Sequence, residues 1–199
     1  MNIGFDLDKV FIDYPPIFPS ILFDKFYKKK DNGILLYRIP SYPEQLVRKA
    51  LHYPLLRPPI KTNLDFLKSI PKDKNKLYLI SSRYKFLEGI TNQLIKKYQL
   101  DTIFDGLYFN YDNKQPHKFK NEVIKWLNLD LYIDDDLSLI NYVAKHNKNT
   151  KFLWLNYRNQ DKQKEKNVYS INQLTEIFKN SWFHQTQSQF SSGGVLSSF

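Results

Sequence analysis

The 199-residue chain contains no cysteine. This absence excludes disulfide bonds and thiolate metal sites, so folding does not require an oxidising compartment. The chain also lacks any apolar run near the roughly 18 residues that a membrane-spanning helix needs. Its first strand-like segment already carries Asp6 and Asp8, which a secretory leader would not tolerate. These absences together predict a cytoplasmic protein with no membrane partner.

Acidic residues are in the minority, with 20 Asp and Glu against 30 Lys and Arg and a formal net charge of +10. Such an excess favours an anionic partner, such as a phosphorylated metabolite or a nucleic acid. Biased nucleotide composition in the source genome explains the many lysines equally well. The 16% of aromatic residues argues against wholesale disorder, and the length allows one buried core with an insertion.

The first third of the chain is interrupted by proline. Because proline removes a backbone donor and constrains its predecessor, we expect no sheet in this region and only short helices over 44–53 and 63–70. About sixty residues separate the first two strong strands, which is far more than a simple crossover needs. We therefore predict a small cap here, and prolines interrupt it at Pro15, Pro16, Pro19, Pro40, Pro43, Pro54, Pro58 and Pro59.

Strands and helices alternate elsewhere. We predict strands over 2–7, 76–81, 107–109, 131–133 and 152–155, helices over 84–98, 116–127 and 137–146, and a last helix from Ser170. This alternation indicates βαβ units and a mainly parallel sheet, hence an α/β, three-layer, Rossmann-like core with a small, mostly helical cap. The predicted boundaries are a core over 1–12 and 74–182, a cap over 13–73 and a flexible tail over 183–199.

Acidic or hydroxyl side chains follow three of the predicted strands. They are Asp6 and Asp8, then Ser81 and Ser82, then the run Asp134, Asp135 and Asp136. In an open parallel sheet, ligands bind beyond the carboxyl ends of the strands. The three endings would therefore gather a nucleophile, hydroxyl donors and metal ligands in one place.

Asp6 and Asp8 lie two positions apart, so both project to the same side of an extended chain. Such a pair can divide its work, with one carboxylate attacking phosphorus and the other transferring a proton. Ser81 and Ser82 could bind a phosphoryl oxygen beside the next helix start. The same residues also suit purely structural roles, because Asp is common in turns and Ser caps helices.

Three adjacent acids at Asp134–Asp136 repel one another at a strand end unless a cation is present. Magnesium prefers oxygen ligands and often takes only one or two carboxylates, although helix capping also accounts for acids here. Lys118 and Lys120 begin the preceding helix, where one of them would stabilise a transferring phosphoryl group. Most lysines in this chain are simply solvated.

In this order, the segments resemble the haloacid dehalogenase superfamily of phosphohydrolases. Asp6-Leu7-Asp8-Lys9-Val10 is similar to the first motif of that family, and Ser81 followed by Ser82-Arg83 to the second. Lys118 in Pro116-His117-Lys118 is similar to the third motif, with Lys120 as a competitor, and Ile133-Asp134-Asp135 to the fourth. The resemblance covers about residues 1–160, looks nearest to the 5′-nucleotidase branch, and departs where Lys9 replaces a frequent glycine.

The resemblance implies a magnesium-dependent phosphatase. Asp6 would be the nucleophile that forms an aspartyl-phosphate, and Asp8 the acid and then the base. Ser81, Ser82 and Lys118 would hold the phosphate. Asp6, Asp134, Asp135 and the backbone carbonyl of Asp8 would bind Mg²⁺, and the cap would set specificity for a small phosphorylated substrate, a nucleotide or a sugar phosphate.

Two alternatives stay open at this stage. One is a phosphatase that acts on nucleic-acid ends, because the cap interleaves basic and aromatic residues in a pattern suited to backbone contact and stacking. The other is a binding protein that keeps the fold without catalysis. The residues behind the first alternative are Arg38, Arg48, Arg57, Lys61, Tyr37, Tyr42 and Tyr53. The oligomeric state is not determined by any of these patterns.

Overall fold

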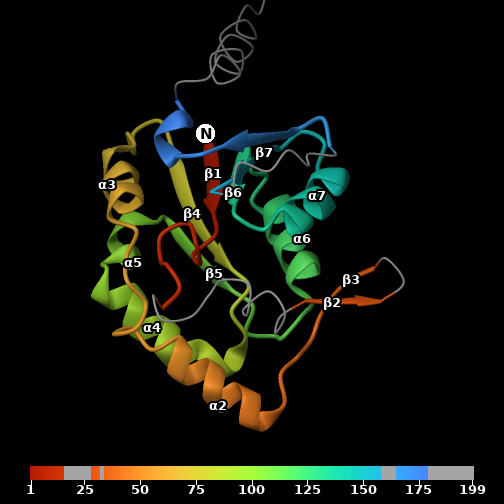
Figure 1. Ribbon diagram of the computed structural model, residues 1–199. Helices are drawn as coiled ribbons and strands as arrows, with labels where there is room; N and C mark the ends of the chain where they lie inside the picture. The colour runs from red at the N-terminus through yellow and green to blue at the C-terminus, as the bar shows by residue number, and fades with distance from the viewer. Residues whose placement is uncertain (16–27, 32–33, 158–164, 179–199) are drawn as a thin grey trace, which may run out of the picture.

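A six-stranded parallel sheet forms the centre of the computed structural model, which describes residues 1–15, 28–31, 34–157 and 165–178 (Figure 1). The strand order is β5-β4-β1-β6-β7-β8, so the first strand lies near the middle of the sheet. The strands are β1 (Asn2–Phe5), β4 (Lys76–Ser81), β5 (Gly106–Phe109), β6 (Leu131–Asp134), β7 (Lys151–Leu155) and β8 (Val168–Ile171).

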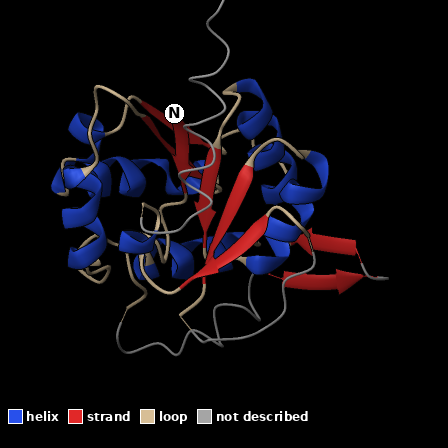
Figure 2. Cartoon of the chain, turned by 90° about the horizontal axis from the view of Figure 1, so that it is seen from above, coloured by secondary structure: helices blue, strands red, loops and turns tan. Residues whose placement is uncertain are grey.

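Helices cover both faces of this sheet, as the view in Figure 2 makes plain. One face carries α3 (Lys61–Ser69), α4 (Glu88–Lys97) and α5 (Leu100–Ile103) with the 3-10 turn η2 (Leu174–Glu176), and the other carries α6 (Pro116–Trp126) and α7 (Leu137–His146). A further 3-10 turn, η1 (Lys85–Leu87), precedes α4. The predicted three-layer α/β architecture is confirmed. Among the described residues, every helix is too short or too polar to cross a bilayer.

The two faces of the sheet follow from strand periodicity. Ile3 and Phe5 point into the layer of α3, α4 and α5, whereas Tyr132 packs with the layer of α6 and α7. The ring of Phe5 lies 5.5 Å from that of Phe11, and Phe11 lies 5.8 Å from Phe104, between ring centroids. Apolar burial on both faces therefore holds the central strands in register.

Two predictions about local structure are wrong. The segment from Ser170 is not a helix start, because 168–171 forms β8 and buries Val168 and Ile171 beside β7. A capping box between Gln173 and Glu176 begins the 3-10 turn η2 instead. The proline-rich region also contains a short antiparallel hairpin, β2 (Lys28–Asp31) with β3 (Ile34–Tyr37), where no sheet was expected.

The segment inserted between β1 and β4 leaves and rejoins the core at one place. The amide of Asp13 donates to the carbonyl of Pro58 at 2.8 Å, and the amide of Ile60 donates to the carbonyl of Phe11 at 2.8 Å. Between these points lie the hairpin and α2 (Tyr42–Leu51), which lies beyond the end of the sheet toward which β1 points (Figure 1). The exact domain boundaries stay a prediction, and the predicted tail over 183–199 lies outside the described residues.

Tyr37 fastens the hairpin to the core. Its backbone exchanges two hydrogen bonds with the side chain of Gln115, at 2.9 and 3.0 Å, and its hydroxyl donates to Asp136 Oδ2 at 2.9 Å. Gln115 precedes α6, and Asp136 caps α7 by accepting from the amides of Ser138 and Leu139. Burial and the Asp136 carboxylate raise the pKa of Tyr37 well above its ordinary value, so the hydroxyl keeps its proton.

Substitution of Gly4 by alanine tests the packing of the central strand. A Cβ at this position would lie 2.5 Å from Leu129 Cδ1 and 2.9 Å from Tyr132 Cδ2. We expect Gly4→Ala to lower the free energy of unfolding by about 1–3 kcal/mol in urea denaturation. Gly89, on α4, has nothing within 4 Å of a built Cβ, so Gly89→Ala should leave stability unchanged or raise it by up to ~1 kcal/mol. Equal effects of the two changes would contradict this packing.

Removal of the Tyr37 hydroxyl tests the fastening of the hairpin. Tyr37→Phe leaves the Asp136 carboxylate without this donor, and we expect a loss of about 1–2 kcal/mol in unfolding free energy. Tyr42, which is 72% exposed on α2, provides the matched control, and Tyr42→Phe should change stability by less than about 0.5 kcal/mol. A Tyr37→Phe protein as stable as the parent would show that the hydroxyl contributes nothing to this junction.

Candidate active site

Asp6 stands where β1 ends, beside the end of β6. Its amide donates to the carbonyl of Ile133 at 2.9 Å, which continues the parallel pairing of the two strands by one residue. This register places the carboxyl groups of Asp6 and Asp134 at the same edge of the sheet. Asp6 is 6% exposed and Asp134 is 1% exposed, so both groups are removed from bulk water.

Lys120 joins these two carboxylates. Its Nζ lies 2.7 Å from Asp6 Oδ1 and 2.6 Å from Asp134 Oδ2, and the lysine side chain is 3% exposed. The Tyr132 hydroxyl also donates to Asp134 Oδ2, at 2.9 Å. Lys118, predicted for this role, is exposed on α6, so that expectation is corrected: the lysine of the site is Lys120.

The helical face explains this choice of lysine. Lys120 lies four residues before Ile124 and four after Pro116, and all three are buried on the side of α6 that faces the sheet. Lys118 lies four residues before Glu122 on the outer side. Residues four apart share one face of a helix, so the apolar spacing of this segment contained the signal that favours Lys120.

The electrostatics of the group follow from its burial. Burial, with the neighbouring Asp134 and Asp8 charges, raises the pKa of Asp6 to about 7, although Lys120 acts in the opposite direction. Burial alone would lower the pKa of Lys120, but Asp134 and Asp6 outweigh it and hold that pKa well above the ordinary value. The ammonium group is therefore charged at neutral pH and offsets much of the negative charge around it.

Three carboxyl groups lie close enough to share a metal ion. One oxygen from each of Asp6, Asp134 and Asp135 lies within 4.8 Å of the others. Burial and the repulsion of Asp134 and Asp6 raise the pKa of Asp135 well above its ordinary value, although Lys120 acts in the opposite direction. Carboxylate oxygens are the ligands that Mg²⁺ prefers, so this donor set fits the ion.

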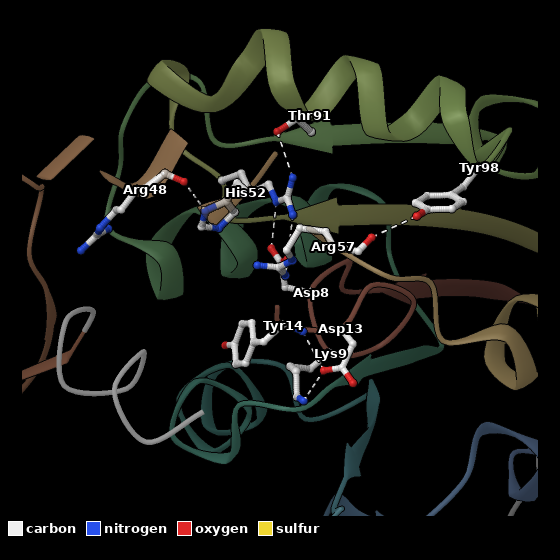
Figure 3. Close-up of polar contacts among 10 residues, drawn as sticks. Asp8, Lys9, Asp13, Tyr14, Arg48, His52, Arg57, Thr91 and Tyr98 are labelled. Atoms are coloured by element: carbon white, nitrogen blue, oxygen red, sulfur yellow. Dashed lines mark hydrogen bonds and ion pairs between the residues drawn. The ribbon is translucent and has the colours of Figure 1, made fainter. Parts of the chain in front are cut away.

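Asp8 faces a different set of partners, drawn in Figure 3. Arg83 donates to it through two nitrogens, Nε to Oδ2 at 2.9 Å and Nη2 to Oδ1 at 2.7 Å, and Arg57 contacts Oδ1 through Nη2. Burial raises the pKa of Asp8, but the two guanidinium groups dominate and hold it well below the ordinary value. In this arrangement Asp8 is an ionised carboxylate rather than a proton donor.

The turn after Asp8 explains why glycine is favoured at the position that Lys9 occupies here. Lys9 has a φ of 61°, a left-handed backbone conformation that glycine adopts without strain. Its amide donates to the carbonyl of Ile12 at 2.7 Å, and its Nζ lies 2.5 Å from Asp13 Oδ1. A glycine at this position would satisfy the same turn, and here the lysine adds an ion pair across it.

The two serines lie at the end of β4, next to β1. Ser81 is the last residue of the strand and is 1% exposed, and Ser82 follows it. Among the described residues, the Ser82 hydroxyl is buried and makes no hydrogen bond. A buried hydroxyl in this state costs free energy, so the position suits an incoming acceptor such as a phosphoryl oxygen. Neither serine caps η1 through a side-chain hydrogen bond, because Tyr84 is the residue before that turn.

Sequence reasoning missed the buried arginines. The nucleic-acid alternative would place Arg48 and Arg57 on a basic surface, but they are 5% and 0% exposed, and Tyr37 is also buried. Arg38 remains at the surface, where it pairs with Glu44. Leu55 and Leu56, which precede Arg57, are 80% and 41% exposed, so the local sequence carried no signal that this charge lies inside the protein.

No family model matches this sequence, and no curated protein gives a significant match. Solved structures do. A haloacid dehalogenase-like hydrolase from Bacteroides fragilis aligns over 89% of this chain and 99% of its own, with a TM-score of 0.58 and 13% identity. The D,D-heptose 1,7-bisphosphate phosphatase from B. bronchiseptica, complexed with magnesium and phosphate, aligns over 94% and 98%, with a TM-score of 0.50 and 9% identity.

A dehalogenase aligns over 62% of this chain with a TM-score of 0.48 and 10% identity, and only 56% of that protein is covered. At identities this low, the comparisons establish architecture and not activity. The chain has the fold of the haloacid dehalogenase-like hydrolases.

Proposed function

We propose that this protein is a Mg²⁺-dependent phosphatase that hydrolyses a small phosphate monoester through an aspartyl-phosphate on Asp6. The observation that carries the proposal is the contact of Lys120 with both Asp6 and Asp134 at the ends of adjacent strands. A nucleophile, a cation and a second carboxylate are thereby held within one hydrogen-bonded unit. The third carboxyl group, from Asp135, completes a set of oxygens suited to a divalent ion.

The reaction would proceed in two displacements. A carboxylate oxygen of Asp6 attacks phosphorus, and the bond between phosphorus and the ester oxygen breaks as the alcohol leaves. Water then attacks the phosphorus of the aspartyl-phosphate, which releases inorganic phosphate and restores the Asp6 carboxylate. Bound through Asp6, Asp134 and Asp135, Mg²⁺ would neutralise charge on the phosphoryl oxygens.

Lys120 and the serines would serve the phosphoryl group. The Lys120 ammonium orients the Asp6 carboxylate and offsets the charge that accumulates when a phosphate approaches two carboxylates. The buried Ser82 hydroxyl can donate to a phosphoryl oxygen, and Ser81 lies at the same end of β4. The contacts of Lys120 with Asp6 and Asp134 are already in place before substrate arrives, so the ammonium group needs little reorganisation.

Asp8 is the candidate for proton transfer, with a condition set by its surroundings. As a carboxylate it can accept a proton from water in the second displacement. To donate a proton to the leaving alcohol in the first displacement, the Asp8 carboxylate must first take up a proton from water, which requires the contacts with Arg57 and Arg83 to loosen. The catalytic role of Asp8 therefore depends on a rearrangement at these two arginines.

The substrate class rests on weaker support than the chemistry. The structural neighbour from B. bronchiseptica acts on a sugar bisphosphate and holds magnesium and phosphate, which supports a phosphorylated metabolite and the metal. A nucleotide remains an equal candidate. Burial of Arg48 and Arg57 removes two of the basic residues on which action at nucleic-acid ends depended, which favours a small substrate.

Asp6→Asn tests the nucleophile. Turnover of p-nitrophenyl phosphate and of a panel of nucleotide and sugar monophosphates with Mg²⁺ should fall by at least about a thousandfold, because the amide cannot form the covalent intermediate. Removal of Mg²⁺ with EDTA should abolish turnover by the parent protein, and adding the ion back should restore it. Thermal melting of the variant controls for folding. Robust activity of Asp6→Asn would reject the assignment.

A matched pair of lysine variants tests the choice between Lys120 and Lys118. Lys120→Met should lower kcat by at least about a hundredfold, because a preorganised charge beside the phosphoryl group is lost. Lys118→Met, on the exposed side of the same helix, should stay within about twofold of the parent.

The first of these variants carries a stability cost that needs its own control. Removing Lys120 leaves buried carboxylates without their cation, which costs about 3–5 kcal/mol of stability. Lys120→Arg keeps the charge and changes its geometry, so a folded Lys120→Arg protein with lowered kcat confirms the positional requirement. Loss of activity in Lys118→Met with retention in Lys120→Met would overturn the assignment.

A further inference from the structure

Arg57 and Arg83 meet on one carboxylate from two distant parts of the chain. Arg57 belongs to the segment inserted after β1, whereas Arg83 lies just beyond the end of β4. Both guanidinium groups contact Asp8, and their side chains are 0% and 3% exposed. Burying a guanidinium is costly, and a single arginine with ideal geometry would pair this carboxylate. A second buried arginine at the same place therefore calls for an explanation beyond the ion pair.

Each arginine is held in place by its own neighbours. The Tyr98 hydroxyl donates to the backbone carbonyl of Arg57 at 3.0 Å, and the Arg57 guanidinium carbon lies 5.0 Å from the centre of the Tyr14 ring (Figure 3). Arg83 Nη1 donates to Thr91 Oγ1 at 3.4 Å. The two charges are thus fixed relative to the sheet, as a preorganised anion site requires.

His52 is a further buried ionisable group beside Arg57 and Arg83. His52 is 4% exposed, and its ring Nδ1 bonds the backbone carbonyl of Arg48 at 2.8 Å. Burial lowers the pKa of His52 well below the ordinary value, and Arg57 and Arg83 lower it further against the opposing effect of Asp8. The imidazole therefore stays neutral beside the two guanidinium groups and adds no charge of its own.

This pair of arginines contacts Asp8, which lies two residues from Asp6 in the chain. Because only Leu7 separates the two acidic residues, the arginines that hold Asp8 lie near the carboxylate that would attack phosphorus. Asp134 and Asp135 approach Asp6 from β6. A substrate whose phosphoryl group is held by Asp6 and Lys120 would therefore have Arg57 and Arg83 near its leaving group.

We propose that Arg57 and Arg83 form a second anion subsite, which binds a carboxylate or phosphate carried by the leaving group of the substrate. The inference rests on the proposed phosphatase function and narrows its substrate class to monoesters with a second anionic group. Guanidinium groups suit this role because their planar donors bind carboxylate and phosphate through paired hydrogen bonds. Asp8 then shares the arginines with the substrate.

Matched substrates test the subsite. Recognition of a carboxylate is tested by comparing phosphoglycolate with ethyl phosphate, which lacks that group. Recognition of a second phosphate is tested by comparing propanediol bisphosphate with propanediol monophosphate. All four esters are assayed with Mg²⁺. We expect kcat/KM of the parent protein to favour the anionic member of at least one pair by about tenfold or more. In Arg57→Gln this preference should fall to about one, whatever the absolute rates.

Control variants separate recognition from structure. Arg38→Gln removes an exposed cap arginine that pairs with Glu44, and it should keep the preference of the parent. Arg57→Lys keeps the charge without the planar donor pair and should retain an intermediate preference, which provides a second reading if Arg57→Gln folds poorly. If Arg57 served only a structural ion pair, Arg57→Gln would lower kcat/KM equally for both substrates of a matched pair. An unchanged preference in Arg57→Gln therefore overturns the subsite.

Failure of the subsite and failure of the phosphatase function give different results. Turnover of all four esters with no preference in the parent protein rejects the subsite and leaves the phosphatase intact. If no ester is hydrolysed, the phosphatase proposal fails, and calorimetric titration of the parent protein with Mg²⁺ decides the subsite. Phosphoglycolate binding at least about tenfold tighter than ethyl phosphate would then support the subsite, and equal affinity would reject it.

Discussion

The burial of Asp6 and Asp134 side by side is the constraint on which the site depends. The parallel register of β1 and β6 forces the two groups to the same edge of the sheet, where few water molecules can solvate them. Two buried charges of one sign are tolerated only with a cation between them. Lys120 supplies that cation from α6, and a divalent ion among Asp6, Asp134 and Asp135 would complete the compensation.

A second charge arrangement lies where the inserted segment meets the core. Asp8 is the meeting point: Arg83 reaches it from β4 and Arg57 from the insertion. The insertion is also joined to the core at Tyr37, whose hydroxyl contacts Asp136, the residue that follows Asp134 and Asp135. Segments that would set specificity are thereby tied directly to residues that would perform chemistry. Movement of the insertion would therefore alter the environment of Asp8.

The regular elements were largely predictable from sequence because they depend on local periodicity. The strands β4, β6 and β7 and the helices α6 and α7 match their predicted ranges within one or two residues. Two errors share a cause. The strand at 168–171 forms by pairing with β7, and β2 and β3 form by pairing with each other. Local propensity does not show which segment a strand will pair with.

The positions of Asp6, Asp8, Ser81 and Asp134 could be inferred from the chain alone, because each follows a recognisable apolar strand and parallel strands end together. The identity of the working lysine and the arginine partners of Asp8 could not be settled in that way. Which of two lysines faces inward depends on how α6 rotates against the sheet. Arg57 and Asp8 meet across 49 residues of chain, and only packing of the insertion against the core brings them into contact.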